Sequence, residues 1–263
     1  MFSIMALPAS LLERLPAELL ARSRGALQLG TAATEVPSLS FGLPLLERLL
    51  PEARLPQGRV TELAVPSSGA LGTTLALSAC AAAQRRFVAT DQDLGEGQGE
   101  GEFCAFVDPS SSLYAPGVAG AGLALERLLV VRPPVERLGA VTLRLLRGDC
   151  FALVVVDTVG PVGRHLHVDL ALWTRRVRQI ALEIEGSRTA VLLLTDQDAP
   201  RRLPLPVARR IELRRPEPDR LQMRVQRDRF GQITGWRSIP WPGISSLAKS
   251  RAREAHSRSV GAG

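Results

Sequence analysis

Lysine is almost absent from this sequence. Of its 33 basic residues, Lys249 is the only lysine and the other 32 are arginines. Any mechanism that requires a catalytic, Schiff-base or phosphate-binding lysine therefore has one candidate, near the C-terminal end of the chain. Arginine codons are favoured in GC-rich genomes, which would account for the bias, and the chemical consequence is the same whatever the cause.

Cysteine and histidine are scarce as well, with three residues of each. Cys80, Cys104 and Cys150 lie far apart and form no CxxC pair, which argues against a disulfide framework and a structural zinc site and suits a reducing cytosol. His165 and His167 have no acidic or cysteine partner at ligand spacing, so we expect a pair of loop residues and no metal site.

Long apolar runs are missing too. The first eight residues lack the basic segment and apolar core of a signal peptide. No apolar stretch approaches the roughly 20 residues that a membrane-spanning helix requires. We therefore expect a cytoplasmic protein without a membrane partner.

The length and composition of the chain fit one large globular domain. The 263 residues are 45% hydrophobic and 22% charged, enough to fill a sizeable core. The net charge of +7 is unevenly placed, because residues 201–263 carry 15 basic and five acidic groups, whereas residues 1–163 carry 13 and 16. Such an asymmetry suggests a basic C-terminal region that can meet a polyanion or an acidic partner.

Hydrophobic patterning predicts an α/β fold. Continuously apolar strands that alternate with helices are typical of a parallel sheet covered on both faces. We expect about five such strands, at 60–65, 103–107, 128–131, 151–156 and 190–195. We expect helices at 10–22, 41–50, 73–84, 135–147 and 168–185.

The pattern changes beyond Pro206. Residues 207–214 and 221–226 alternate apolar with polar, and a turn at 229–231 leads into a further apolar segment at 233–236. This alternation predicts antiparallel strands that extend the sheet and present one solvent-facing, arginine-rich face.

These patterns predict three regions along the chain. Residues 1–40 would form an N-terminal helix and connector, 41–240 the core, and 241–263 a basic, disordered tail. Residues 91–102 hold five acids, four glycines and no basic residue, which indicates a solvated loop.

A degenerate phosphate-binding loop follows the first core strand. Residues 64–75 provide a strand end, a turn containing Gly69, and a helix that opens with Thr73 and Thr74, which is the context in which backbone N–H groups bind phosphate. The loop also needs a lysine immediately before the hydroxyl residue, to neutralise the β- and γ-phosphates. Gly72 occupies that position.

Two strands end in aspartate. Asp157 has the form of a strand-end carboxylate directed at Mg²⁺, although any parallel strand can end in an aspartate that caps a loop.

Beyond Asp108, Ser110 offers a hydroxyl where a hydrolase would need a carboxylate base. There is no Gly-x-Ser-x-Gly nucleophile motif. We assign no catalytic residue and no cofactor.

Seven arginines in the C-terminal strands are candidates for binding DNA or a partner protein, because guanidinium groups bind phosphate and carboxylate in bidentate fashion. The alternative is a solvated sheet edge that carries charge against aggregation. Few aromatic residues accompany them for stacking on bases. The seven are Arg209, Arg210, Arg214, Arg215, Arg224, Arg227 and Arg229.

Several segments resemble the RecA ATPase core over roughly residues 38–235. Residues 55–63 (LPQGRVTEL) resemble the strand that enters the phosphate loop, and 104–108 (CAFVD) and 154–157 (VVVD) resemble the next strands. A closer resemblance is to ImuA, the RecA-like protein of bacterial DNA-damage-induced mutagenesis cassettes, sometimes labelled SulA-like. It rests chiefly on 114–123 (YAPGVAGAGL) and 127–133 (RLLVVRP).

This resemblance implies a RecA-like fold that acts without catalysis in the SOS response, as an accessory to translesion synthesis. The implied partners are ImuB, which is a polymerase homologue without catalysis, and an error-prone DNA polymerase. RecA itself and weak DNA binding are further candidates, and such complexes would be nucleoid-associated. Gly72 and Ser110 replace the RecA lysine and catalytic glutamate, which agrees with a lost ATPase.

Two alternatives remain open from the sequence. One is a divergent DNA-dependent ATPase or recombinase. The other is a cell-division inhibitor, suggested only by the SulA-like label. The short Pro/Arg stretch after Gln197, where RecA has a long glycine-rich DNA-binding loop, argues against RecA-style filament formation on DNA.

Overall fold

The computed structural model describes residues 36–66, 71–88, 102–160, 166, 168–198 and 204–241. The chain divides into two compact units, Met1–Pro37 and Ser38–Gly263, and the description below concerns the second. The expected helix at 10–22, most of the acidic loop, both loop histidines and the tail beyond Trp241 lie outside the described residues.

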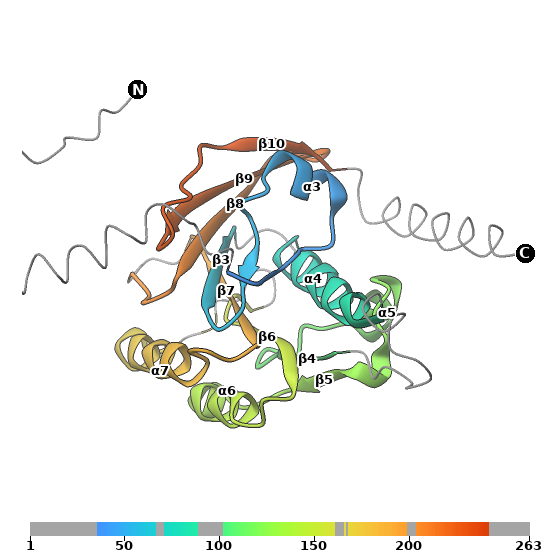
Figure 1. The fold of residues 1–263 in the computed structure, drawn as a ribbon. Helices are drawn as coiled ribbons and strands as arrows, with labels where there is room; N and C mark the ends of the chain where they lie inside the picture. The colour runs from blue at the N-terminus through green and yellow to red at the C-terminus, as the bar shows by residue number, and fades with distance from the viewer. Residues whose placement is uncertain are drawn as a thin grey trace, which may run out of the picture. The chain divides into compact units, whose positions relative to one another are not determined.

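One eight-stranded sheet organises this unit, in the order β10-β9-β8-β3-β7-β6-β4-β5 (Figure 1). The strands from β8 to β5 in this order pair in parallel, and β9 and β10 are antiparallel additions at one edge. The strands are β3 (Val60–Val65), β4 (Phe103–Val107), β5 (Leu128–Val131), β6 (Phe151–Asp157), β7 (Ala190–Asp196), β8 (Arg209–Glu217), β9 (Arg220–Asp228) and β10 (Arg237–Pro240).

Helices cover both faces of the sheet. Figure 1 shows α4 on one side and α6 with α7 on the other. No described helix combines the length and the apolar character that a bilayer span requires. The helices are α3 (Pro44–Leu49), α4 (Leu71–Val88), α5 (Ala115–Gly120), α6 (Leu138–Leu146) and α7 (Leu170–Glu183), with short 3₁₀ turns η2 (Leu125–Arg127) and η3 (Val135–Arg137) and a small antiparallel pair β1 (Ser38–Leu39) and β2 (Leu55–Pro56).

The apolar strands supply two cores. In β6, Leu153 and Val155 pack in the core that contains α3 and α4, whereas Val154 and Val156 pack in the core beneath α6 and α7. Successive side chains of a strand point to opposite faces, so a strand buried on both faces is predominantly apolar. The predicted fold class, a mostly parallel sheet flanked by helices and extended by antiparallel strands, is confirmed.

The predicted central strands are confirmed, whereas the predictions for the strands after Pro206 are wrong in part. β3, β4 and β5 have the predicted bounds, and β6 and β7 are each one residue longer. β8 was expected to be antiparallel, but it pairs in parallel with β3, with Thr61 opposite Arg209. The parallel part of the sheet therefore has six strands, and antiparallel pairing begins at β9.

The final strand lies further along the chain than residues 233–236. The backbone N–H of Thr234 donates to the carbonyl of Val225 at 3.0 Å, and the Thr234 hydroxyl accepts from the Val225 N–H at 2.9 Å. The Thr234 side chain thus accepts the hydrogen bond that a backbone carbonyl of a paired strand would otherwise accept from Val225. Regular pairing with β9 begins only at Arg237, opposite Met223.

Candidate functional site

The predicted phosphate-loop residues that the structure describes lie near the C-terminal ends of the parallel strands. β3, β4 and β6 run parallel, so the end of β3, Asp108 after β4 and Asp157 at the end of β6 lie on the same side of the sheet. Gly72, with Thr73 and Thr74, belongs to the first turn of α4. Gly69 lies outside the described residues.

Gly72 is packed tightly against the end of β3. A Cβ atom placed on Gly72 would lie 2.9 Å from Cγ1 and 3.2 Å from Cγ2 of Val65. Val65 is a buried, β-branched residue with little rotamer freedom. The position where a phosphate loop carries its lysine therefore accepts a side chain only if Val65 or the start of α4 shifts.

Asp157 ends β6 as a buried carboxylate. Its Oδ1 accepts a hydrogen bond from the Val159 N–H at 2.9 Å, and the side chain lies almost entirely out of solvent. Burial raises the pKa of Asp157 to about 6, and the negative charge of Asp108 also raises it, while hydrogen bonds from the backbone N–H groups of Val159 and Gly160 oppose the shift. The carboxylate thus lacks a cationic partner among the described residues.

Asp108, by contrast, is bonded mainly within its own loop, and its Oδ2 also lies 3.7 Å from Nε of Arg132. Its two oxygens accept hydrogen bonds from the backbone N–H groups of Ser112 and Leu113, both at 3.0 Å, and from the hydroxyls of Ser110 and Ser112. These bonds hold Ser111 at a left-handed φ of 55°. The Ser110 hydroxyl, which stands where the resemblance to RecA places a glutamate, therefore donates to a loop-capping aspartate.

Four of the seven candidate arginines share one face of β8 and β9, which we call the arginine face: Arg210, Arg214, Arg224 and Arg227. Arg210 lies opposite Arg227 in the strand register, and Glu212 lies opposite Arg224. Side-chain alternation places Glu62 on the same face as Val60, which packs beneath α6 and α7. The arginine face therefore continues the sheet face that these two helices cover.

Acidic residues neutralise part of this face. Arg210 Nη1 donates to Glu62 at 2.6 Å, and Thr195 donates to the same carboxylate oxygen at 2.8 Å. Arg224 forms an ion pair with Glu212 at 2.6 Å, and Glu212 also contacts Arg210 at 3.4 Å. The resulting chain of alternating charges crosses β3, β8 and β9, so Arg210 and Arg224 have little unbalanced charge to offer a ligand.

Trp236 lies against the arginine face. The guanidinium carbons of Arg214 and Arg224 lie 4.0 and 4.6 Å from the centre of its ring, within the range of cation–π attraction. Arg214 also donates to Gln222 at 2.7 Å, a neutral partner. Arg214 thus keeps its net charge while being held in place by an aromatic ring.

Arg209 is a correction to the predicted set, because it is buried and structural. Its Nε donates to Asp228 at 2.9 Å, and the two side chains are 4% and 0% exposed. Its remaining donors bond the carbonyls of Glu52 and Arg54 and the side chain of Gln232. It ties the segment after α3 to the end of the β8–β9 pair and presents no donor to a ligand.

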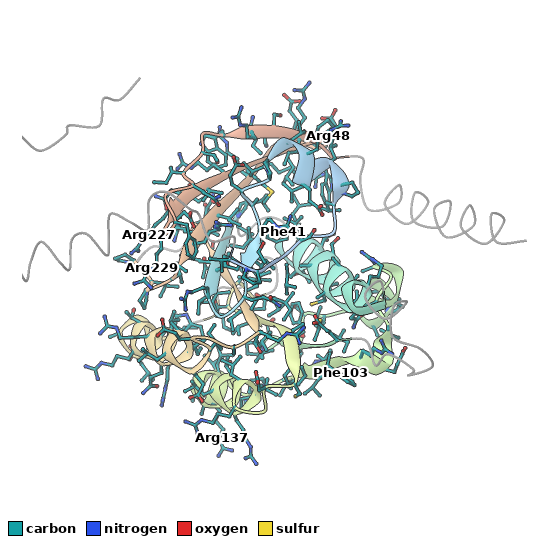
Figure 2. All side chains as sticks on the ribbon, viewed as in Figure 1. Phe41, Arg48, Phe103, Arg137, Arg227 and Arg229 are labelled. Atoms are coloured by element: carbon teal, nitrogen blue, oxygen red, sulfur yellow. The ribbon has the colours of Figure 1, made fainter. Side chains whose placement is uncertain are left out.

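Four candidate arginines are exposed: Arg214, Arg215, Arg227 and Arg229. Arg215 donates to the carbonyl of Pro218, Arg227 donates to the carbonyl of Leu205, and Arg229 follows β9 directly. Figure 2 shows Arg227 and Arg229 close together beside the ends of β8 and β9. These four are the members of the predicted set whose charge no described acid neutralises.

Sequence reasoning missed the acidic residues that decide which arginines are free. Glu62 and Asp228 are buried partners of Arg210 and Arg209. A sequence signal existed for Glu62, since it is the only charged residue in the otherwise uncharged strand Val60–Val65. A lone buried carboxylate requires a partner.

The curated proteins that this chain resembles include RecA proteins of rhizobia. No protein-family model matches the chain. RecA of Rhizobium rhizogenes strain K84 is 28% identical over 172 residues, which cover 61% of this chain and 44% of that protein. RecA of Rhizobium etli is similar to the same extent, so the chain spans less than half the length of these curated relatives. The chain is thus similar in sequence to RecA over this region, and its mostly parallel sheet with flanking helices is consistent with a RecA-like α/β fold.

Proposed function

We propose that this chain is a non-catalytic accessory protein of DNA-damage-induced mutagenesis, in which a RecA-like fold serves as a binding scaffold. The finer assignment rests on the resemblance of residues 114–123 and 127–133 to the ImuA group. Its mechanism is the assembly of a complex for translesion synthesis, without nucleotide turnover by this chain.

The observation that carries the proposal is the contact between Gly72 and Val65. A working phosphate loop needs a cationic side chain at this place, and a Cβ atom on Gly72 would already meet Val65 at 2.9 Å. Ser110, bonded to Asp108, supplies no general base. Both features support a scaffold that has lost the ATPase chemistry of its relatives.

The partners in this proposal are ImuB, an error-prone DNA polymerase and RecA, with weak DNA binding through the exposed arginines. Such a protein acts in the cytoplasm and joins the nucleoid with its partners. Co-purification from DNA-damaged cells tests this, with undamaged cells as the control. Recovery of ImuB supports the proposal, and recovery of the tubulin-like division protein without ImuB would favour a division inhibitor.

The second candidate function is a divergent DNA-dependent ATPase, and the retained Asp157 at the end of β6 favours it. Titration with labelled ATP and Mg²⁺, with and without single-stranded DNA and with RecA as a positive control, separates the two. We expect no DNA-stimulated hydrolysis. Hydrolysis that disappears in the Asp157→Ala variant would refute the scaffold proposal.

A further inference from the structure

The outer surface of α6 and α7 is strongly basic, which the distribution of charge along the chain did not predict. Six arginines and three acidic residues (Glu136, Asp169 and Glu183) lie in η3, α6 and α7 or cap these two helices. They occur in two stretches that are separated in sequence, and the fold brings these together by packing α6 beside α7 (Figure 1). The arginines are Arg137, Arg144, Arg147, Arg175, Arg176 and Arg178.

Most of this charge is not neutralised. Arg147 contacts Glu183 at 3.4 Å, with 68% and 33% of the two side chains exposed, and Arg176 donates to Gln179 at 2.9 Å. Within the part of the chain that the structure describes, Arg144, Arg175 and Arg178 form no ion pair. Figure 2 shows Arg137 directed away from the ribbon beside α6.

A groove of about 490 Å³ lies between the two helices. Its lining residues are Leu143, Arg147, Arg176, Gln179, Leu182 and Glu183. The two helices are in contact at Gly139, where a Cβ atom would lie 2.7 Å from Cγ of Arg176. Leu182 is 66% exposed at the edge of the groove, an apolar side chain within a basic surface.

We propose that this groove docks an acidic, amphipathic helix of a partner protein. One apolar side chain of the partner would pack between Leu143 and Leu182, and its carboxylates would pair with the surrounding arginines. Charge complementarity selects an acidic partner. The leucines favour a peptide over nucleic acid, because none of the lining residues is aromatic and leucine offers no stacking surface to a base.

This surface is separate from the degenerate phosphate loop, so the inference goes beyond the proposed function and does not require it. A partner that occupied the groove would compete with Glu183 for Arg147. The ion pair between these two residues is largely exposed and contributes little, so its exchange costs little.

Fluorescence anisotropy with a labelled helical peptide of about 20 residues, with leucines on one face and glutamates on the others, tests the proposal. We expect Leu182→Ser, and separately the double change Arg144→Glu and Arg175→Glu, to weaken binding about tenfold. The double change Arg188→Glu and Arg237→Glu alters net charge equally at exposed positions outside the groove and should leave binding nearly unchanged.

Coincident thermal unfolding of these variants and the wild type would show that the exposed substitutions leave the fold intact. The proposal is overturned if a leucine-free peptide of the same charge binds the wild type equally well, or if the control reversal weakens binding as much as the groove reversal. It is also overturned if single-stranded DNA displaces the peptide and binds the Leu182→Ser variant as tightly as the wild type.

Discussion

Gly72 and Val65 are so close that a Cβ atom on Gly72 would lie 2.9 Å from Cγ1 of Val65. The absence of lysine from the phosphate loop is therefore matched by the packing around it. Val65 fills the space beside the first turn of α4, so a single substitution at Gly72 does not rebuild the loop.

A double-mutant cycle measures this contact. Overpacking a well-filled site costs about 1–3 kcal/mol, more than the roughly 1 kcal/mol that alanine gains over glycine within a helix. Gly72→Ala should therefore lower the free energy of unfolding in the wild type and be neutral or stabilising in the Val65→Ala background. Urea unfolding of the four proteins gives the coupling energy, and strictly additive effects would contradict the contact.

Removal of the guanidinium should affect stability strongly at Arg209 and hardly at all at Arg215. Arg209→Ala leaves Asp228 buried and unpaired, which should lower the free energy of unfolding by about 3–5 kcal/mol. Arg215→Ala, at an exposed site on the same strand, should change it by less than about 0.5 kcal/mol. Denaturant titration distinguishes them, and equal small effects would show that Arg209 is not a structural residue.

Asp157 should make the stability fall as the pH rises. Its pKa of about 6 in the folded chain exceeds the ordinary value of 3.8, so folding favours the protonated form. The cost of the buried charge is absent below about pH 4, grows through about pH 6 and is then constant, reaching about 3 kcal/mol in the fully charged state.

The Asp157→Asn variant should accordingly gain stability relative to the wild type between about pH 4 and pH 8, by up to about 3 kcal/mol. Denaturant unfolding at several pH values checks this, with the exposed Asp219→Asn as the matched control. A difference between variant and wild type that does not change with pH would contradict the buried charge.

DNA binding by the exposed arginines should depend steeply on salt. Each phosphate contact on a single strand contributes about −0.7 to the slope of log affinity against log salt concentration. Arg227→Ala and Arg229→Ala should each make the slope shallower by about that amount, whereas Arg188→Ala, outside these strands, should not. Anisotropy over a salt series provides the test, repeated on a chain that lacks residues 245–263 to separate any contribution of the tail.

The α/β class and the central strands could be read from the sequence. A strand buried on both faces is predominantly apolar, so the bounds of Val60–Val65 and Phe103–Val107 could be predicted from the sequence. At the edge of the sheet, the position of β10 could not be predicted from the sequence. The Thr234 hydroxyl accepts the Val225 N–H hydrogen bond that the alternating sequence pattern assigns to a backbone carbonyl. The sequence also shows that the phosphate loop lacks its usual cation, because Gly72 occupies the lysine position and Lys249 is the only lysine.

Only the tertiary structure decided which arginines are free. Arg209 and Arg210 are neighbours in the sequence, but the alternation of β8 sends one into the core with Asp228 and the other to Glu62, 148 residues away. The groove between α6 and α7 also arises only when two separate arginine-bearing helices pack side by side. The amino-acid sequence specifies how many charges the chain carries, whereas long-range pairing and burial determine which of them can meet a partner.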